Sequence, residues 1–111
     1  MTTLKPCHAG DVGDTRVLTL SGVADLNSVA SIESHVTNGV DTTATLTTTV
    51  TDGDANEVTV ALGESGGWLP LGPTLGQWRG QVEVVFNDGA ELTWPNNGRG
   101  FFTINVLPQY G

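Results

Sequence analysis

The sequence predicts an all-β fold: a single antiparallel β-sandwich of about seven strands, preceded by an extended N-terminal arm. Fifteen glycines and five prolines among 111 residues argue against helices, because glycine is costly inside a helix and proline breaks one. Threonine and valine are abundant, and their branched side chains favour strands. Short alternating apolar runs recur between clusters of Gly, Asp and Asn, as in sandwiches and barrels.

The first half of the chain contains the arm and four expected strands. Residues 1–14 lack an alternating pattern and are interpreted as an extended arm outside the core, which leaves 15–111 as the sandwich domain. In the first strand, Val17 and Leu20 are the expected core side chains. The four strands are expected over residues 15–20, 28–36, 43–51 and 57–62.

Alternation assigns one face of each later strand in this half to the core. The expected inward residues are Ala30, Ile32, Val36, Leu46, Thr48, Val50, Val58, Val60 and Leu62. The other threonines of the third strand then point outward. After the fourth strand, residues 63–76 form a long connection that is rich in Gly and Pro yet also apolar. Such a loop is expected to cap one end of the sandwich or to cover a neighbour.

A hairpin and a final strand complete the prediction. Alternation over 78–86 predicts a strand, the Asn-Asp-Gly turn at 87–89 favours a tight reversal, and a short strand then ends at Pro95. The last strand is expected over 99–107. The expected inward residues are Trp78, Gly80, Val82, Val84, Phe86, Leu92, Trp94, Phe102, Ile104 and Val106. Gly80 is expected to mark a bulge, or a place where Trp78 or Trp94 lies over the backbone.

Charge and targeting signals exclude several classes of partner. Twelve acidic residues against four basic ones give a net charge of -8, so phosphate backbones and anionic lipid surfaces would be repelled. We therefore expect neither a nucleic acid nor a membrane partner. The first six residues contain no apolar signal segment, and no run reaches the length of a membrane span. The protein is expected to be made in the cytoplasm without a cleaved leader.

Few residues suggest a metal or a cofactor. The single cysteine, Cys7, cannot form an internal disulfide, and Cys7-His8 is the only Cys/His pair. His35 and Glu33 share an outward face of the second strand, which is at most a weak pair of ligands. Because a tetrahedral zinc site needs further ligands at paired spacings, no metal and no cofactor are expected.

The remaining chemical motifs also have simple structural explanations. Residues 52–56 resemble the start of a calcium-binding loop, but Glu57 and Gly63 occupy the positions that require glycine and glutamate. A hairpin turn explains the same residues. No serine lies in a Gly-x-Ser-x-Gly motif, and the acids are scattered over turns and outward faces. We expect no enzymatic activity and no catalytic residues.

The closing half of the chain resembles a known family. Residues 76–89, then Thr-Trp-Pro-Asn-Asn-Gly at 93–98, then 102–104 are similar to the immunoglobulin-like domain found at the N-terminus of siphophage upper baseplate proteins and in related phage virion proteins. The Gly-Asp-Val-Gly run at 10–13 and the segment 25–30 are similar to its opening half. The resemblance implies an immunoglobulin-like sandwich and a structural role in a virion. Family members usually continue into a C-terminal body; the sequence ends at Gly111, so no receptor-binding trunk is expected.

The function expected on this basis is non-enzymatic. The chain would be a small decoration or accessory protein, bound in many copies to the surface of a phage capsid or tail, with a major virion protein and copies of itself as partners. The arm and the apolar loop would supply the contacts, and Arg16, Arg79 and Arg99 are candidate charge partners for an acidic neighbour. The partner-binding residues expected are Leu4, Lys5, Pro6, Trp68, Leu69, Pro70 and Leu71.

The tryptophans leave an alternative open. A tail or baseplate adhesion module would bind host-surface carbohydrate through exposed threonine faces and an aromatic platform. Trp78 and Trp94 fall on the core face, so ordinary packing explains them. Trp68 lies in the apolar loop, where it would either contact another protein or cap the sandwich end.

Overall fold

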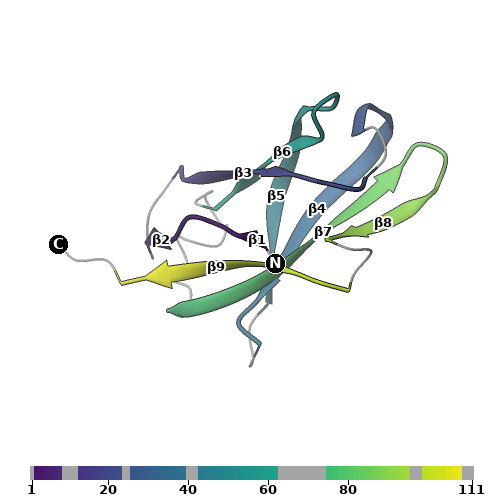
Figure 1. Ribbon diagram of the computed structural model, residues 1–111. Coiled ribbons are helices and arrows are strands. Elements are labelled where there is room, and N and C mark those ends of the chain that lie inside the picture. The colour runs from purple at the N-terminus through teal and green to yellow at the C-terminus, as the bar shows by residue number, and fades with distance from the viewer. Residues whose placement is uncertain are drawn as a thin grey trace.

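The computed structural model describes residues 2–8, 13–23, 26–39, 43–62, 75–95 and 99–108. These residues are almost entirely β-structure, as the sequence predicts, with one short 3-10 turn, η1 (Leu26–Ser28). The strands, labelled in Figure 1, are β1 (Thr2–Thr3), β2 (Cys7–His8), β3 (Thr15–Thr19), β4 (Val29–Thr37), β5 (Thr43–Asp52), β6 (Glu57–Ala61), β7 (Gly76–Phe86), β8 (Glu91–Trp94) and β9 (Phe102–Leu107).

The strands form one curled, mixed sheet. Its order is β1-β9-β7-β4-β5-β6-β3, with β2 also on β9 and β8 also on β7. The curl arises at β5, because residues 43–47 pair with β4 whereas residues 48–52 pair with β6. In the view of Figure 1, β3 lies across β5 and β4. One hydrophobic cluster joins side chains of β3 and β6 to side chains of β7 and β9, so the curled sheet encloses a single core.

Most of the predicted faces are confirmed by burial, and two assignments are wrong. Val17 is 59% exposed, and its neighbour Leu18 is buried instead, because the even-numbered residues of β3 face the core. Ala30 is exposed because the ladder between β4 and β7 shifts register between Val29 and Ser31. A bulge of this kind moves one residue out of the alternation.

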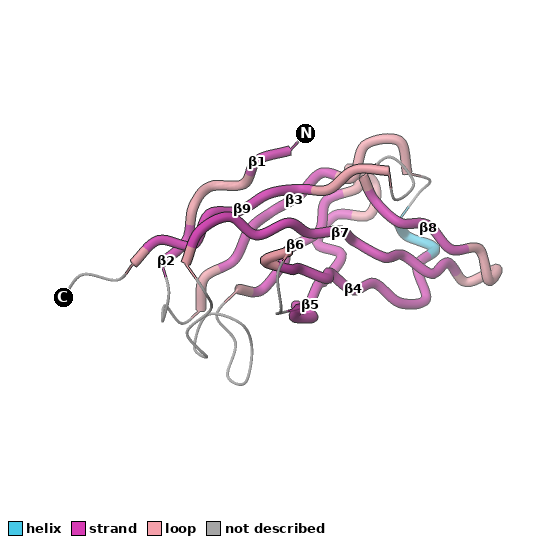
Figure 2. The backbone as a smooth tube through the Cα atoms, turned by 90° about the horizontal axis from the view of Figure 1, so that it is seen from below, coloured by secondary structure: helices cyan, strands magenta, loops and turns pink. Residues whose placement is uncertain are grey.

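The position of the N-terminal segment differs most from the architecture that the sequence predicts. We interpreted residues 1–14 as an arm outside the core, but β1 and β2 both pair with β9, in parallel. The Leu4 amide donates to the Thr103 carbonyl at 2.8 Å, and the side chains of Leu4 and Cys7 are buried in the core. Figure 2 shows this segment running beside β9. Residues 2–8 are therefore extended, as expected, but they belong to the sheet.

Strands β8 and β9 lie end to end along the same edge of β7. Residues 82–85 of β7 pair with β8, and residues 76–80 pair with β9. The predicted last strand, 99–107, begins three residues late in the structure, at Phe102. The predicted apolar loop lies almost wholly outside the described residues; of it, only Leu75, which is exposed, and Gly76, the first residue of β7, can be placed.

Gly80 has a packing role that the sequence did not identify correctly. Its pairing with Val36 on one side and Phe102 on the other is regular, without a bulge. A Cβ atom at Gly80 would lie only 2.6 and 2.7 Å from Cε1 and Cε2 of Phe102. The ring that covers the Gly80 backbone is thus Phe102 and not Trp78 or Trp94.

The two described tryptophans are core residues, as the sequence predicts. Trp78 is fully buried and Trp94 is 4% exposed. The Nε1 atom of Trp94 is a buried donor without a hydrogen-bond partner. Trp94 also lines a hollow of about 390 Å³ between the turn at residues 21–23 and β8. Neither tryptophan presents an aromatic platform on the surface.

One buried polar pair joins β4 to β5. The hydroxyl groups of Ser34 and Thr48 are 2.6 Å apart, and Thr48 Oγ1 also donates to the Leu46 carbonyl at 3.1 Å. Because the single Thr48 proton is used in the bond to Leu46, Ser34 is the donor between the two hydroxyls.

We expect Thr48→Val to cost about 1–3 kcal/mol of unfolding free energy, because it leaves the buried Ser34 hydroxyl without an acceptor. Ser34→Ala should cost less, since Thr48 keeps its bond to Leu46. The double variant Ser34→Ala/Thr48→Val should be more stable than Thr48→Val alone. Urea unfolding of the three variants measures these differences, and equal, additive costs would contradict the assigned donor.

Candidate binding surfaces

The predicted partner-binding residues near the N-terminus fall in different environments. Leu4 is buried in the core, whereas the side chains of Lys5 and Pro6 are exposed. The carbonyl oxygens of Lys5 and Pro6 accept hydrogen bonds from Arg16, at 2.9 and 2.6 Å. The other four predicted contact residues, 68–71, lie outside the described part of the chain.

Arg16 joins the N-terminal segment to β3. Besides its two bonds to that segment, its guanidinium contacts Asp14 Oδ1 at 2.6 Å and the Thr15 carbonyl at 2.7 Å. The side chain is only 12% exposed. Arg16 was a candidate charge partner for an acidic neighbour, but the structure uses it internally. The two other candidates, Arg79 and Arg99, are exposed.

The free edge of β3 is largely closed by its own chain. The Leu62 amide donates to the Asp14 carbonyl and the Leu20 amide to the Asn56 carbonyl, so the even-numbered residues make the ladder with β6. The odd-numbered backbone groups therefore face outward. Asp14 Oδ1 accepts from the Thr15 amide, and Arg16 donates to the Thr15 carbonyl. Among the described residues, only the middle of the edge, around Val17, stays open. Because so little free edge remains, pairing with a strand of another chain is discouraged.

A broad surface without positive charge covers β3, β6 and the second half of β5. We call it the threonine face. Thr15, Val17 and Thr19 stand opposite Ala61, Thr59 and Glu57 across the β3–β6 pairing, and Thr59 Oγ1 donates to Thr51 Oγ1 at 3.4 Å. The face consists of Thr15, Val17, Thr19, Thr49, Thr51, Thr59 and Ala61.

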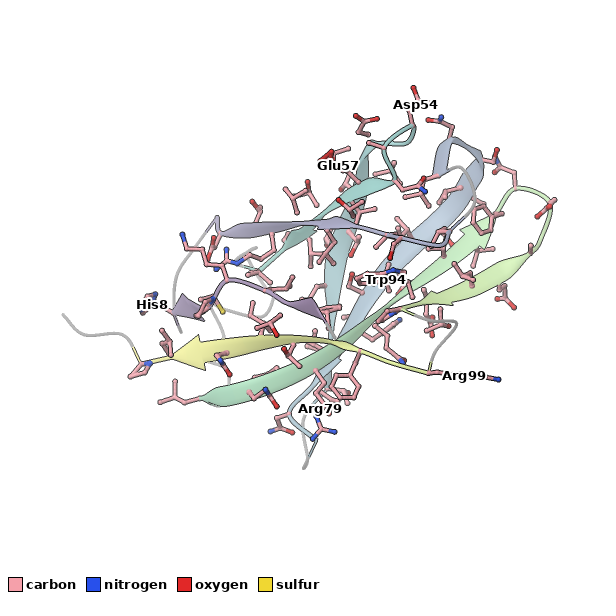
Figure 3. The ribbon with its side chains drawn as sticks, in the orientation of Figure 1. His8, Asp54, Glu57, Arg79, Trp94 and Arg99 are labelled. Carbon is pink, nitrogen blue, oxygen red and sulfur yellow. The ribbon has the colours of Figure 1, made fainter. Side chains whose placement is uncertain are left out.

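Acidic residues of the β5–β6 turn lie at one end of the threonine face, and the paired Asp14 and Arg16 lie at the other end. Figure 3 shows Asp54 and Glu57 together at the β5–β6 turn, with Arg79 and Arg99 on the opposite side of the molecule. The rest of the face offers hydroxyl and methyl groups only. The sequence predicted the outward threonines of β5, but the contribution of β3 and β6 depends on their pairing.

The predicted calcium-like motif forms the β5–β6 turn, as the turn explanation expects. Asp52 Oδ1 accepts a hydrogen bond from the Ala55 amide at 3.2 Å, and Asn56 adopts a left-handed φ of 55°. Asn27 donates to Asp54 Oδ1 at 2.8 Å, which occupies one carboxylate oxygen of the turn. Among the described residues, no group of three or more His, Cys, Asp or Glu side chains could hold a metal ion.

A second candidate surface lies on the outer side of β4 and β7. We call it the β4–β7 face. It consists of three cross-strand pairs in register: Thr37 with Arg79, His35 with Gln81, and Glu33 with Glu83. The predicted outward pair of His35 and Glu33 is thus confirmed, and Glu83 joins it from β7. The structure gives His35 Nε2 distances of 3.3 Å to Glu83 and 3.8 Å to Glu33.

A groove of about 270 Å³ occupies one end of the β4–β7 face, between Thr43 and Phe101. The Arg79 guanidinium lies over the Phe101 ring, 5.0 Å from its centroid. Gln81 donates to the Gly100 carbonyl at 2.8 Å, which holds the segment that carries Phe101 against β7. The groove therefore combines an aromatic ring, a cation and hydroxyl groups.

Comparison with known proteins gives no match to a protein-family model and no match to a curated protein. In the part of the chain that the structure describes, no helix is long and apolar enough to cross a membrane.

Proposed function

We propose that this chain is a non-enzymatic structural protein of a bacteriophage virion: a small decoration or accessory protein, bound in many copies to the capsid or tail surface. The observation that carries the proposal is the threonine face. On a chain of net charge -8, it is a surface of the described residues that another protein can cover without burying an unpaired charge. The motif resemblance over residues 76–104 supports the virion context.

We further propose that the curled sheet is an immunoglobulin-like sandwich. The strand order supports this: β3-β6-β5 corresponds to strands B, E and D of that fold, and β4-β7 continued by β8 and β9 corresponds to C, F and G. In this assignment β5 crosses from one layer to the other. A stiff body of this kind suits a protein that docks in many copies on a larger particle and whose function depends on its surfaces and loops.

Docking through the threonine face can be tested with charge substitutions. Val17→Glu/Thr49→Glu places two carboxylates on the face, on strands separated by β6, so that they do not stand directly opposite each other. We expect binding to purified particles to fall by about 100-fold or more, because these carboxylates would be desolvated in the contact. Cosedimentation of the purified protein with particles that lack it measures the loss.

The matched control is Asn87→Glu/Ala90→Glu, which adds the same charge at the exposed β7–β8 turn. It should bind particles like the unmodified chain, and both variants should keep its thermal unfolding midpoint to within a few degrees. Mass spectrometry of purified virions gives the independent check. Absence of the protein from virions, or equal binding by the two variants, would contradict the proposal.

A second candidate function is the adhesion module that binds host-surface carbohydrate. The observation that favours it is the groove beside Phe101, because an aromatic ring next to hydroxyl and guanidinium donors is suited to sugar rings. Calorimetric titration with cell-wall sugars, compared between the unmodified chain and Phe101→Ala, separates the two functions. Binding that depends on Phe101 would favour adhesion, and its absence together with recovery in the virion would favour decoration.

A further inference from the structure

The β4–β7 face has opposite charges at its two ends. Along the pairing of β4 with β7, Arg79 lies at one end, the His35–Gln81 pair in the middle, and Glu33 with Glu83 at the other end. Glu83 lies four positions after Arg79 on β7, which corresponds to about 13 Å. All three charged side chains are exposed.

Among the described residues, neither end has its charge balanced by an ion pair with a strong partner. Glu33 and Glu83 stand directly opposite each other, an arrangement that costs free energy for like charges. Among the described residues, the only basic side chain that contacts either carboxylate is His35. Arg79 stacks on Phe101, and no carboxylate in the described structure forms an ion pair with it. In the described part of the chain, the acidic end thus has no lysine or arginine partner and the basic end has no carboxylate partner.

We propose that the β4–β7 face is a two-fold interface between two copies of this chain. Packing two such faces antiparallel, about an axis through the His35–Gln81 pair, brings Arg79 of each copy to the two glutamates of the other. A two-fold contact uses the same patch twice, so one patch with both charges is self-complementary. Face-to-face packing of two sheets is a common arrangement, and the groove beside Phe101 leaves room for a side chain of the second copy.

A second copy accounts for the face better than other protein partners. A basic partner would pair Glu33 and Glu83 but repel Arg79, and an acidic partner would do the reverse. The molecule measures 46 × 25 × 20 Å along its principal axes, so its broad side is large enough for the roughly 800 Å² per partner of a standard interface. The proposal concerns the free protein and does not depend on the virion role.

Sedimentation velocity of the full chain tests the interface through charge exchange. We expect the unmodified protein to dimerise at concentrations of about 100 µM or below, with weaker association at high salt. Arg79→Glu alone and Glu83→Arg alone should each weaken dimerisation by about tenfold or more, because like charges then meet twice. An equimolar mixture of the two variants should form heterodimers, since both contacts between position 79 and position 83 then join opposite charges.

The controls are Arg99→Glu and Asp54→Arg, which make the same changes of charge at exposed positions outside the face. They should dimerise like the unmodified chain, and all four variants should show its circular dichroism spectrum. A monomer at every concentration would overturn the proposal. So would controls that weaken association as much as the face variants do, or folded face variants that fail to associate when mixed.

Discussion

Gly80→Ala is expected to cost about 1–3 kcal/mol of unfolding free energy, and Gly80→Val more, because the added atoms enter space that the Phe102 ring fills. Phe102 is 1% exposed, and its ring atoms Cε1 and Cε2 would lie 2.6 and 2.7 Å from the new Cβ. The ring is surrounded by core side chains and cannot move aside without displacing them. The cost therefore comes from strain in the core and not from the backbone conformation of Gly80.

Chemical unfolding of a double-mutant cycle separates this clash from other effects. Phe102→Leu in the Gly80→Ala background should relieve the contact, so the double variant should lose less stability than the two single variants added together. Gly100→Ala is the matched control, since its nearest contact would be Pro95 Cγ at an ordinary 3.6 Å. Strict additivity of the two core substitutions would show that the ring does not limit residue 80.

Arg16→Met is expected to cost about 2–4 kcal/mol and to make the protein self-associate. The guanidinium makes four hydrogen bonds, to the carbonyls of Lys5, Pro6 and Thr15 and to Asp14. A hydrogen bond to a charged group contributes about 1.5–3 kcal/mol to stability. Because Asp14 is partly exposed, solvent screening lowers the summed contribution of the four bonds. Loss of Arg16 also uncovers the Thr15 carbonyl at the edge of β3, which invites pairing with another chain.

Hydrogen exchange and sedimentation measure the two consequences separately. The Leu4 amide, bonded to Thr103, should exchange faster in Arg16→Met, while amides in the middle of β7 should change only with global stability. Arg16→Lys should restore part of the stability, because lysine keeps the charge but cannot reach four acceptors with one ammonium group. Unchanged Leu4 exchange in Arg16→Met would show that Arg16 does not hold the segment.

The N-terminal segment changes what truncation should do. Taken as a free arm, residues 1–12 would be dispensable for folding. In the structure, deleting them removes the buried Leu4 and Cys7 side chains and the parallel partners of β9. The shortened chain should be less stable, so loss of particle binding on truncation would not by itself identify an anchor.

Strands and their faces were the part of the fold that local sequence could predict. The ranges expected for β5, β6 and β7 agree with the structure to within two residues at each end. Alternation has a period of two that is visible within six or seven residues, and turn residues such as those at 87–89 act on their own backbone. The outward threonines of β5 and the buried tryptophans of β7 and β8 were predicted for the same reason.

The candidate surfaces were only partly predictable. The sequence located Glu33 and His35 on one outward face. That Glu83 stands opposite Glu33 depends on the register of β4 against β7, which the sequence does not show. Likewise, Val17 joins the threonine face because β3 pairs with β6 through its even-numbered residues. Of the residues expected to bind a partner, Lys5 and Pro6 present exposed side chains, and Leu4 does not.

The sequence by itself determined that this chain is β-structure, which side chains of most strands face inward, and that its surface is acidic. The tertiary structure alone decided that Thr2–His8 lies on β9, that Phe102 covers Gly80, that Arg16 joins two distant segments, and that two glutamates face each other. The physical reason is the sequence separation over which each kind of interaction acts. Side-chain alternation and turn preferences act between neighbours along the chain, whereas strand pairing and core packing join residues up to 100 positions apart, where no local pattern records the partner.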